Sequence, residues 1–413
     1  KPVTQKALVV GGGPAGLAAA VSLAARKIDV TLVEKTNKIG GNLVNIQDDQ
    51  IKEDIQKLVS DVENHSMVTI HLESEVAQSF GTPGQFVSRI RHQSGEEEPV
   101  MHGATILATG GQPSETQSYS REESDKITTV FELEKQIHDP GFLRTPVKTA
   151  VFIQCVDSRE EPKNYCSRLC CLKSVKSAIK IADTHPDAQV YVFYRDIMTY
   201  GESEKFYTEA RKKGVIFIPF SHDQKPQIEI DSGRVIVSGH DPILNETVSF
   251  DADIVALATG VHPNAIKTIQ SVFGITITED GFIKEADSKW RPVDTGKEGI
   301  FVCGLARNPL RADEAIKEGK AAAQRAIRIL SKEAIISPRQ VARVRHAICS
   351  LCEICIETCP YGARYVEPEL GRIMVDQTSC QGCGTCAAAC PNSATVMAQI
   401  EETGIMDAIE AAL

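Results

Sequence analysis

The sequence lacks an excess of basic residues and any long apolar run. Its 45 Lys and Arg are outnumbered by 55 Asp and Glu, which gives a formal net charge of -10. That balance argues against a nucleic-acid partner, because phosphate binding needs a net basic face. We find no stretch of about 18 apolar residues that could span a bilayer. The chain also starts at Lys1 without methionine or a visible signal peptide, so we interpret it as the back portion of a longer polypeptide or a trimmed form.

Thirteen cysteines are present, but they do not show the scatter of a disulfide framework. Most of them sit in closely spaced runs that are typical of metal ligation, which fits a reducing cytoplasm. A length of 413 residues with 42% apolar content suggests about two to four domains with sizeable cores.

The strongest signal is a duplicated cysteine run between Cys349 and Pro391. It reads CSLCEICIETCP and then CQGCGTCAAACP, matching the pattern of bacterial ferredoxins with two [4Fe-4S] clusters. In that pattern the last cysteine of each run ligates the other cluster. One set is therefore Cys349, Cys352, Cys355 and Cys390, and the other is Cys380, Cys383, Cys386 and Cys359. Zinc sites or disulfides are the alternatives, but a zinc site needs only four ligands and leaves the third cysteine of each run unexplained.

A glycine fingerprint follows the first apolar run, KALVVGG. Gly11, Gly13 and Gly16 supply G-x-G-x-x-G between an expected strand and helix, and Glu34 ends the next expected strand. The glycines permit the turn, the approach of a pyrophosphate and close helix packing, and the acid suits a ribose hydroxyl. Together with Gly40-Gly41, this start resembles the FAD-binding domain of flavoproteins with two dinucleotide-binding domains, rather than an NAD domain. A glycine turn in an unliganded α/β protein is the alternative.

Two A-T-G segments, ATILATGG at 104–111 and DADIVALATG at 251–260, resemble the points where such flavoproteins cross between their two domains. We therefore expect a discontinuous FAD domain at 1–115 and 251–335, interrupted by a second Rossmann-like domain at 116–250. A ferredoxin domain at 336–400 and a helical tail at 401–413 follow. The expected FAD contacts are Gly11, Gly13, Pro14, Ala15, Gly16, Glu34, Lys35, Gly41, Thr109, Gly110 and Gly304. Relatives usually have Asp after the last of these glycines, whereas this chain has Leu305.

The second domain lacks the glycine fingerprint that NAD(P)H binding requires. Its first strand, TAVFIQCV, leads instead into an acidic loop that suits a pyrophosphate poorly. Four cysteines gather there: Cys155, Cys166, Cys170 and Cys171. They could hold a third iron-sulfur cluster, or they could be buried or regulatory thiols.

This loop, FIQCVDSREEPKNYCSRLCCLKSVK, and the later segment DIMTYGESEKFYTEARKKGVIFI closely resemble the A-type subunit of heterodisulfide reductase and its relatives. With the FAD start and the ferredoxin, the resemblance covers nearly the whole chain. It implies a third cluster at the four cysteines. It also implies a lysine near the flavin, matched by Lys176, which is otherwise an ordinary surface lysine. The family's N-terminal domain is absent from the sequence given, and 42–100 has no cysteine where methanogen-type members carry an inserted ferredoxin module.

The predicted fold is thus α/β, with two Rossmann-like, thioredoxin-reductase-like domains and a C-terminal α+β ferredoxin domain. The predicted function is that of an oxidoreductase: an electron-transfer subunit of a heterodisulfide-reductase-like complex that passes electrons between FAD and [4Fe-4S] clusters. Hydrogenase, formate dehydrogenase or ferredoxin would be its partners, and bifurcation at the flavin depends on the full set of clusters. The alternative is an NAD(P)H-dependent iron-sulfur flavoprotein like the small subunit of glutamate synthase.

Overall fold

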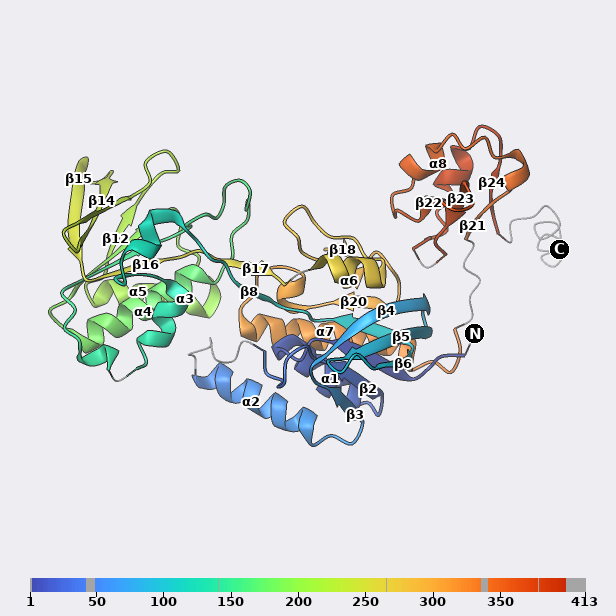
Figure 1. The fold of residues 1–413 in the computed structure, drawn as a ribbon, viewed down its shortest axis with the longest axis horizontal. Coiled ribbons are helices and arrows are strands. Elements are labelled where there is room, and N and C mark those ends of the chain that lie inside the picture. The colour runs from blue at the N-terminus through green and yellow to red at the C-terminus, as the bar shows by residue number, and fades with distance from the viewer. Residues whose placement is uncertain are drawn as a thin grey trace.

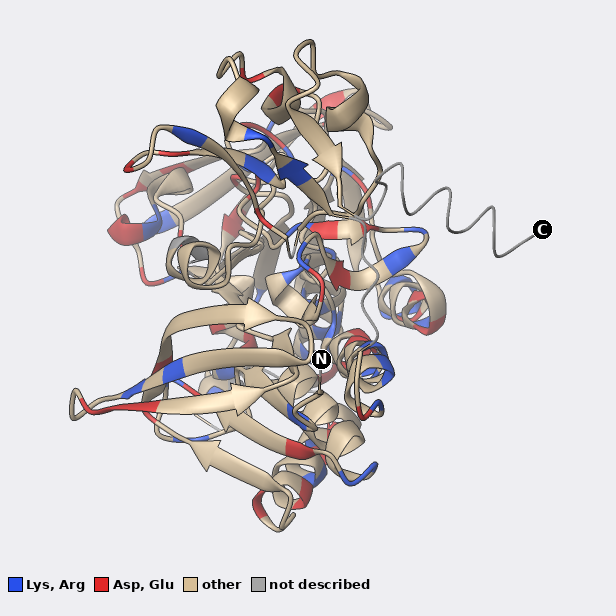
Figure 2. Cartoon of the chain, turned by 90° about the vertical axis from the view of Figure 1, so that its right-hand side faces the viewer, with Lys and Arg blue, Asp and Glu red and all other residues tan. Residues whose placement is uncertain are grey.

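The computed structural model describes residues 2–41, 49–139, 141–264, 266–335, 341–377 and 379–398. These residues form two α/β domains and a small ferredoxin domain, arranged in the order second domain, first domain, ferredoxin along the long axis of the molecule (Figure 1). The expected tail at 401–413 lies outside the described residues. Acidic and basic residues are interspersed along the chain (Figure 2), in keeping with its modest net charge. Among the described helices, none is both long and apolar enough to cross a membrane.

The first domain is built on a seven-stranded sheet in the order β18-β19-β20-β7-β1-β2-β3. Its parallel part comprises β1 (Lys6–Val10), β2 (Asp29–Val33), β3 (Val68–His71), β7 (Ala104–Leu107) and β20 (Ile300–Val302), and β18 (Glu285–Asp287) and β19 (Arg291–Thr295) extend it antiparallel. The near-continuous apolar strands are buried on both faces, as parallel strands usually are.

Helices cover one face of this sheet. They are α1 (Pro14–Ala24), α2 (Asp49–Glu63) and α7 (Ala312–Leu330). The other face packs against α6 (Ile266–Phe273) and a three-stranded antiparallel sheet of β4 (Ser74–Thr82), β5 (Gln85–His92) and β6 (Glu97–His102). A Cβ on Gly319 of α7 would lie 2.0 Å from the carbonyl oxygen of Ala15, so these two helices touch backbone to backbone.

The second domain has a parallel sheet in the order β12-β11-β10-β16-β9. Its strands are β9 (Ile127–Thr129), β10 (Thr149–Ile153), β11 (Gln189–Tyr194), β12 (Ile216–Pro219) and β16 (Ile254–Leu257). One face packs on α3 (Val130–Gln136), α4 (Cys170–Thr184) and α5 (Glu204–Lys212), and the other on the meander β13 (Gln227–Asp231), β14 (Arg234–Asp241) and β15 (Glu246–Ala252).

The chain crosses between the two domains at β8 (Gly111–Pro113) and β17 (Val261–Pro263), which pair antiparallel with each other. The return to the first domain comes later than the expected position 251, because β15 and β16 both belong to the second domain. The A-T-G signature marks the end of a strand, and the crossing follows it.

The ferredoxin domain has two antiparallel pairs, β21 (Ala342–Val344) with β24 (Thr395–Met397) and β22 (Arg364–Glu367) with β23 (Arg372–Val375). One-turn helices α8 (Ile354–Glu357) and α9 (Thr385–Ala388) carry the third cysteine of each run. Each begins after a residue with positive φ, Glu353 at 61° and Gly384 at 77°. Short 3₁₀ turns occur at Ser118–Glu123, Phe142–Arg144, Gly201–Ser203, Gly304–Ala306 and His346–Ile348.

Candidate functional site

The glycine fingerprint lies between β1 and α1, and each of its glycines has a distinct role. A Cβ on Gly11, where φ is +109°, would lie 2.2 Å from the carbonyl oxygen of Ala108, and one on Gly16 would lie 1.9 Å from the carbonyl oxygen of Gly11. The nearest atom to a Cβ on Gly13 is 4.0 Å away. The first and third glycines thus serve the turn and the packing, while the second borders open space, as a pyrophosphate-binding backbone requires.

Glu34 ends β2 beside this turn. Its buried carboxylate accepts hydrogen bonds from the backbone N–H of Gly12 at 2.7 Å and of Thr36 at 2.9 Å. These bonds fix the acid at the position where a ribose hydroxyl would bind. The neighbouring Lys35 is exposed.

The other expected FAD contacts follow neighbouring strands. Thr109 and Gly110 come after β7, and the carbonyl oxygen of Thr109 accepts a bond of 2.6 Å from the Asn264 side chain. Gly304 comes after β20, with φ +70° and its N–H bonded to Glu318 at 3.0 Å. Since β1, β2, β7 and β20 are parallel, these residues meet at one edge of the sheet, where ligands of open α/β sheets bind.

Leu305 takes a different role from the Asp usual in relatives. It is partly buried and packs against the helical core of the second domain, which Leu169 and Cys170 also join. Leu305 therefore makes an apolar contact between the two domains.

The loop between β10 and α4 and the first turn of α4 bring together four cysteines. Burial, together with the charges of Cys155 and Cys166, raises the pKa of the Cys171 thiol to about 12. Burial also raises the pKa of Cys170, again with the other three thiols contributing. Four thiols that repel one another when ionised lie close together, and such a group favours a shared cation or metal cluster.

The loop has an unusual backbone. Cys155, Asp157, Arg159 and Arg168 all have φ between 48° and 64°. Residues other than glycine rarely adopt this conformation, and it tends to cluster at functional sites. The strain supports a role for the loop beyond connecting a strand to a helix.

Side chains of the cysteine loop form hydrogen bonds at and just before the start of β17, where the chain crosses to the first domain. Lys163 donates to the carbonyl oxygen of Thr259 at 2.7 Å, and Tyr165 donates to that of Val261 at 2.8 Å. Ser167 accepts a bond of 2.9 Å from the N–H of Val261. The cysteine loop is therefore fixed beside the passage into the first domain.

One carboxylate joins the cysteine loop to α7 of the first domain. Glu314 accepts bonds of 2.8 and 2.9 Å from the Tyr200 hydroxyl, and Arg168 of the loop pairs with it at 3.4 Å. The guanidinium groups of Arg168 and Arg311 each lie 4.8 Å from the centre of the Tyr200 ring. Tyr200, in the segment Thr199–Gly201, thus contributes to the contact between the two domains.

Lys176 lies on α4, five residues after Cys171. Its ammonium is half-buried and lies 4.6 Å from the centre of the Phe206 ring on α5. The structure therefore places it between two helices of the second domain.

The eight cysteines of the ferredoxin domain gather into two hollows. Cys349, Cys352, Cys355 and Cys390 line one, and Cys359, Cys380, Cys383 and Cys386 line the other. These are the two crossed sets that the spacing predicts, each with three thiols from one run and the last from the other. Each set fits the ligand shell of one [4Fe-4S] cube.

Hydrogen bonds to sulfur repeat between the two halves. The N–H of Ala363 donates to Cys359 at 3.4 Å, and the N–H of Ala394 donates to Cys390 at 3.2 Å. The hydroxyl of Thr385 lies 3.3 Å from Cys383 and lowers the pKa of that thiol. Donors of this kind stabilise thiolates and tune the potential of a cluster.

A buried guanidinium lies between the two hollows. Arg364 is only 3% exposed, lines the second hollow and donates to the hydroxyl of Thr395, which lines the first. Within the described ranges its Nε and Nη1 atoms have no hydrogen-bond partner. Burial raises the pKa values of Cys355 and Cys386, and the charge of Arg364 opposes both rises. One fixed cation therefore acts on a thiol of each set.

Sequence reasoning missed Arg364 and Glu314. Arg364 follows the C-P-Y-G-A turn at the start of a β-hairpin, a place where a charged residue usually faces water. Glu314 is one of two acids in the first turn of α7, and only the tertiary structure supplies its partners.

Comparison with known proteins agrees with this geometry. Residues 9–73 match the model of an NAD(P)-binding Rossmann-like domain, and residues 348–394 match that of a 4Fe-4S dicluster domain. The A-type subunit of the H(2):CoB-CoM heterodisulfide,ferredoxin reductase of Methanothermobacter marburgensis is 34% identical over 300 residues, covering 67% of this chain and 45% of that protein. An A-type iron-sulfur subunit of the CoB--CoM heterodisulfide reductase of Methanopyrus kandleri is 28% identical, covering 90% of this chain and 71% of the relative.

The chain is a relative of the A-type subunit of heterodisulfide reductase. It spans 45% of the Methanothermobacter protein and 71% of the Methanopyrus protein. Among solved structures, Lactococcus lactis thioredoxin reductase (TM-score 0.54, 19% identity, 79% of this chain and 99% of that one) and T. acidophilum thioredoxin reductase (TM-score 0.53, 17% identity, 78% and 98%) share its fold. The predicted thioredoxin-reductase-like α/β fold with a ferredoxin domain is confirmed.

This chain joins a dinucleotide-binding Rossmann-like domain and a 4Fe-4S dicluster domain. The residues predicted for FAD meet at one sheet edge, and those predicted for two cubes line two hollows. The residues present therefore fit both kinds of cofactor.

Proposed function

We propose that this chain is an electron-transfer subunit of a heterodisulfide-reductase-like complex. It would bind FAD at the edge formed by Gly11, Gly13, Glu34 and Gly304, and two [4Fe-4S] clusters in the ferredoxin hollows. FAD exchanges electrons in pairs or singly and each cube carries one, which is the chemistry that these groups supply. The chain's own residues position the groups and set their electrostatic surroundings.

The observation that carries this proposal is the loop between β10 and α4. In a nicotinamide-dependent flavoprotein that loop would hold the glycine fingerprint and a pyrophosphate. Here the loop and the first turn of α4 hold four thiols, three acidic residues and a strained backbone. We propose that Cys155, Cys166, Cys170 and Cys171 hold a third cluster. We also propose that Lys176, which the resemblance to the family implies near the flavin, tunes its potential.

Cofactor analysis of the full chain tests the proposal. After anaerobic purification and reconstitution we expect about twelve irons per FAD, since each of three cubes holds four irons. C170S should lose about four of them while the ferredoxin clusters remain. C303A is the matched control, because Cys303 is buried and lies outside all three cysteine sets.

Two outcomes would contradict the proposal. Fewer than about eight irons in a protein that holds FAD would remove the ferredoxin part. Rapid bleaching of the flavin by NADH or NADPH in the isolated chain would favour the NAD(P)H-dependent reductase instead.

We further propose that the ferredoxin domain delivers electrons to other members of the complex. Cubes of this kind commonly have potentials near about -400 mV, which suit exchange with hydrogenase, formate dehydrogenase or ferredoxin. Anaerobic affinity purification at native expression levels should recover at least one such protein. Recovery of the chain alone, with full cofactor content, would contradict this part.

A further inference from the structure

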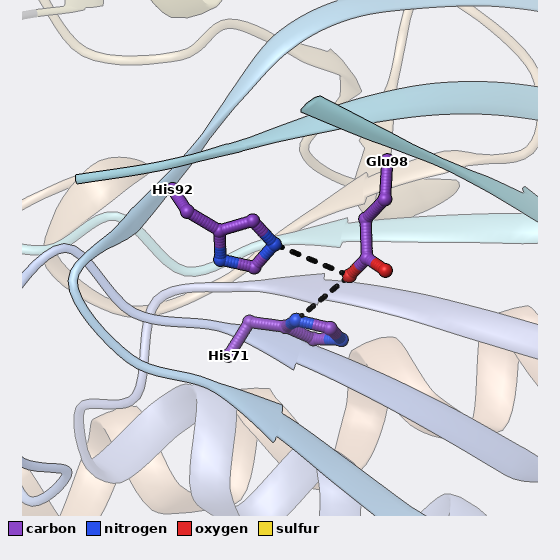
Figure 3. A group of neighbouring side chains, drawn as sticks. All are labelled: His71, His92 and Glu98. Atoms are coloured by element: carbon purple, nitrogen blue, oxygen red, sulfur yellow. Dashed lines mark ion pairs between the residues drawn. The ribbon is translucent and has the colours of Figure 1, made fainter. Parts of the chain in front are cut away.

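Three side chains from three strands converge at the edge of the first domain (Figure 3). His71 ends β3, His92 ends β5, and Glu98 lies in β6. The carboxylate atom Oε1 of Glu98 lies 3.0 Å from Nδ1 of His71 and 3.4 Å from Nε2 of His92. One potential ligand atom from each residue lies within 4.8 Å of the other two.

The protonation of His92 follows from its neighbour. The hydroxyl of Ser74 donates its single proton to the carbonyl oxygen of Leu72 at 2.6 Å. Its oxygen must therefore accept the contact of 3.0 Å with Nδ1 of His92, which places the ring proton of His92 on Nδ1. The other ring nitrogen, Nε2, lies on the side of Glu98, 3.4 Å from its Oε1.

Glu98 offers the third potential ligand atom. Its Oε1 is buried, and neither contact with an imidazole has the geometry of a hydrogen bond, so this oxygen has no hydrogen-bond partner among the described residues. A buried carboxylate oxygen without a partner is costly, and a cation bound by it and the two imidazoles would satisfy it.

We propose that His71, His92 and Glu98 bind one divalent cation of the zinc class. Two imidazoles and a carboxylate with one open position form a known zinc ligand set. Zinc bonds of about 2.0–2.1 Å in tetrahedral geometry place neighbouring ligand atoms about 3.3 Å apart, close to the two observed separations. Ser74 orients His92 through its distal nitrogen, as outer hydrogen bonds commonly do for metal ligands.

The ion would join two sheets. β3 is the edge strand of the seven-stranded sheet, whereas β5 and β6 belong to the antiparallel sheet packed on it. A bound ion would therefore hold the edge strand to the covering sheet. This site is separate from the cysteine hollows and from the dinucleotide edge.

The test measures zinc binding to the full chain with its iron-sulfur clusters loaded, so that the clusters occupy the cysteines. Equilibrium dialysis against zinc chloride, followed by elemental analysis, compares the wild type with H92Q and with E98Q. The Glu98 side chain is 44% exposed, so E98Q carries little risk to folding. H240Q is the matched control, because His240 lies on β14 of the other domain.

We expect the wild type and H240Q to bind one zinc ion more per chain than H92Q and E98Q. Zinc X-ray absorption should show nitrogen and oxygen neighbours, and zinc should raise the melting temperature of the wild type but not of H92Q. Equal zinc content in the wild type and both site variants would overturn the proposal. Sulfur neighbours around the extra zinc would overturn it as well, by placing the ion on cysteines.

Discussion

Replacing Arg364 by glutamine should lower the reduction potentials of both ferredoxin clusters. Each occupied hollow would carry the negative charge of four thiolates, and a fixed cation nearby favours the reduced, more negative state. At a separation of about 7 Å and an effective dielectric constant of about 20, two unit charges interact by about 2.4 kcal/mol. For a one-electron couple, where about 1.4 kcal/mol corresponds to about 59 mV, that energy amounts to about 100 mV per cluster.

The assay is a redox titration of the full chain monitored by electron paramagnetic resonance, after iron content has been measured. R364K keeps the charge and should titrate near the wild type. R372Q removes an exposed arginine from the partner strand of the same hairpin and should change little, because solvent screens it. The reasoning is refuted if R364Q, at full iron content, titrates at the wild-type potentials, or if R364K shifts as far as R364Q.

Other predictions concern the dinucleotide edge, the first domain and the contact between domains. G13A should fold, because its Cβ would meet only open space in the protein, but it should lose FAD, because that space is where the pyrophosphate would approach the backbone. G16A should fail to fold, because its Cβ would lie 1.9 Å from a carbonyl oxygen. Circular dichroism reports folding and flavin absorbance reports FAD binding, so the two measurements separate these outcomes. His102 is buried and its pKa is lowered from 6.5 to about 4. The unfolded state therefore binds the extra proton, and up to about 3 kcal/mol of stability, fully present above pH 6.5, should be lost as pH falls toward 4; denaturant titrations should show a flatter pH profile in H102Q. Y200F and E314Q should show a coupling energy of about 1 kcal/mol in a double-mutant cycle of unfolding, and additive effects would deny the contact.

Local chemistry explains why some features could be predicted from the sequence. The cysteine spacing and the G-x-G-x-x-G turn are short-range patterns, since the chain must wrap a cube or a pyrophosphate within a few residues. They led to the two hollows and to the edge beside Gly11. The resemblance of the loop around Cys166 to the heterodisulfide reductase family was likewise readable, because that loop is continuous in sequence.

Contacts between distant segments could not be predicted in this way. Arg364 is charged and stands in a hairpin, so only the fold reveals that it is buried between two sets of thiols. His71 and Glu98 come from strands of different sheets, and nothing in their spacing indicates that they meet. The crossing at β17 came later than expected, because the A-T-G signature reports a strand end rather than a domain boundary.

The ribbon of β8 and β17 has a mechanical consequence. Three residue pairs connect its strands, and two of these pairs contain a proline, Pro113 or Pro263, which cannot donate to the ladder. A ribbon with so few cross-links resists twisting weakly. The relative position of the two α/β domains therefore depends on side-chain contacts outside the ribbon. These include Glu314 with Tyr200 and Arg168, and Leu305 against the core of the second domain. Changes that remove these contacts would leave the weakly cross-linked ribbon as the main connection between the domains.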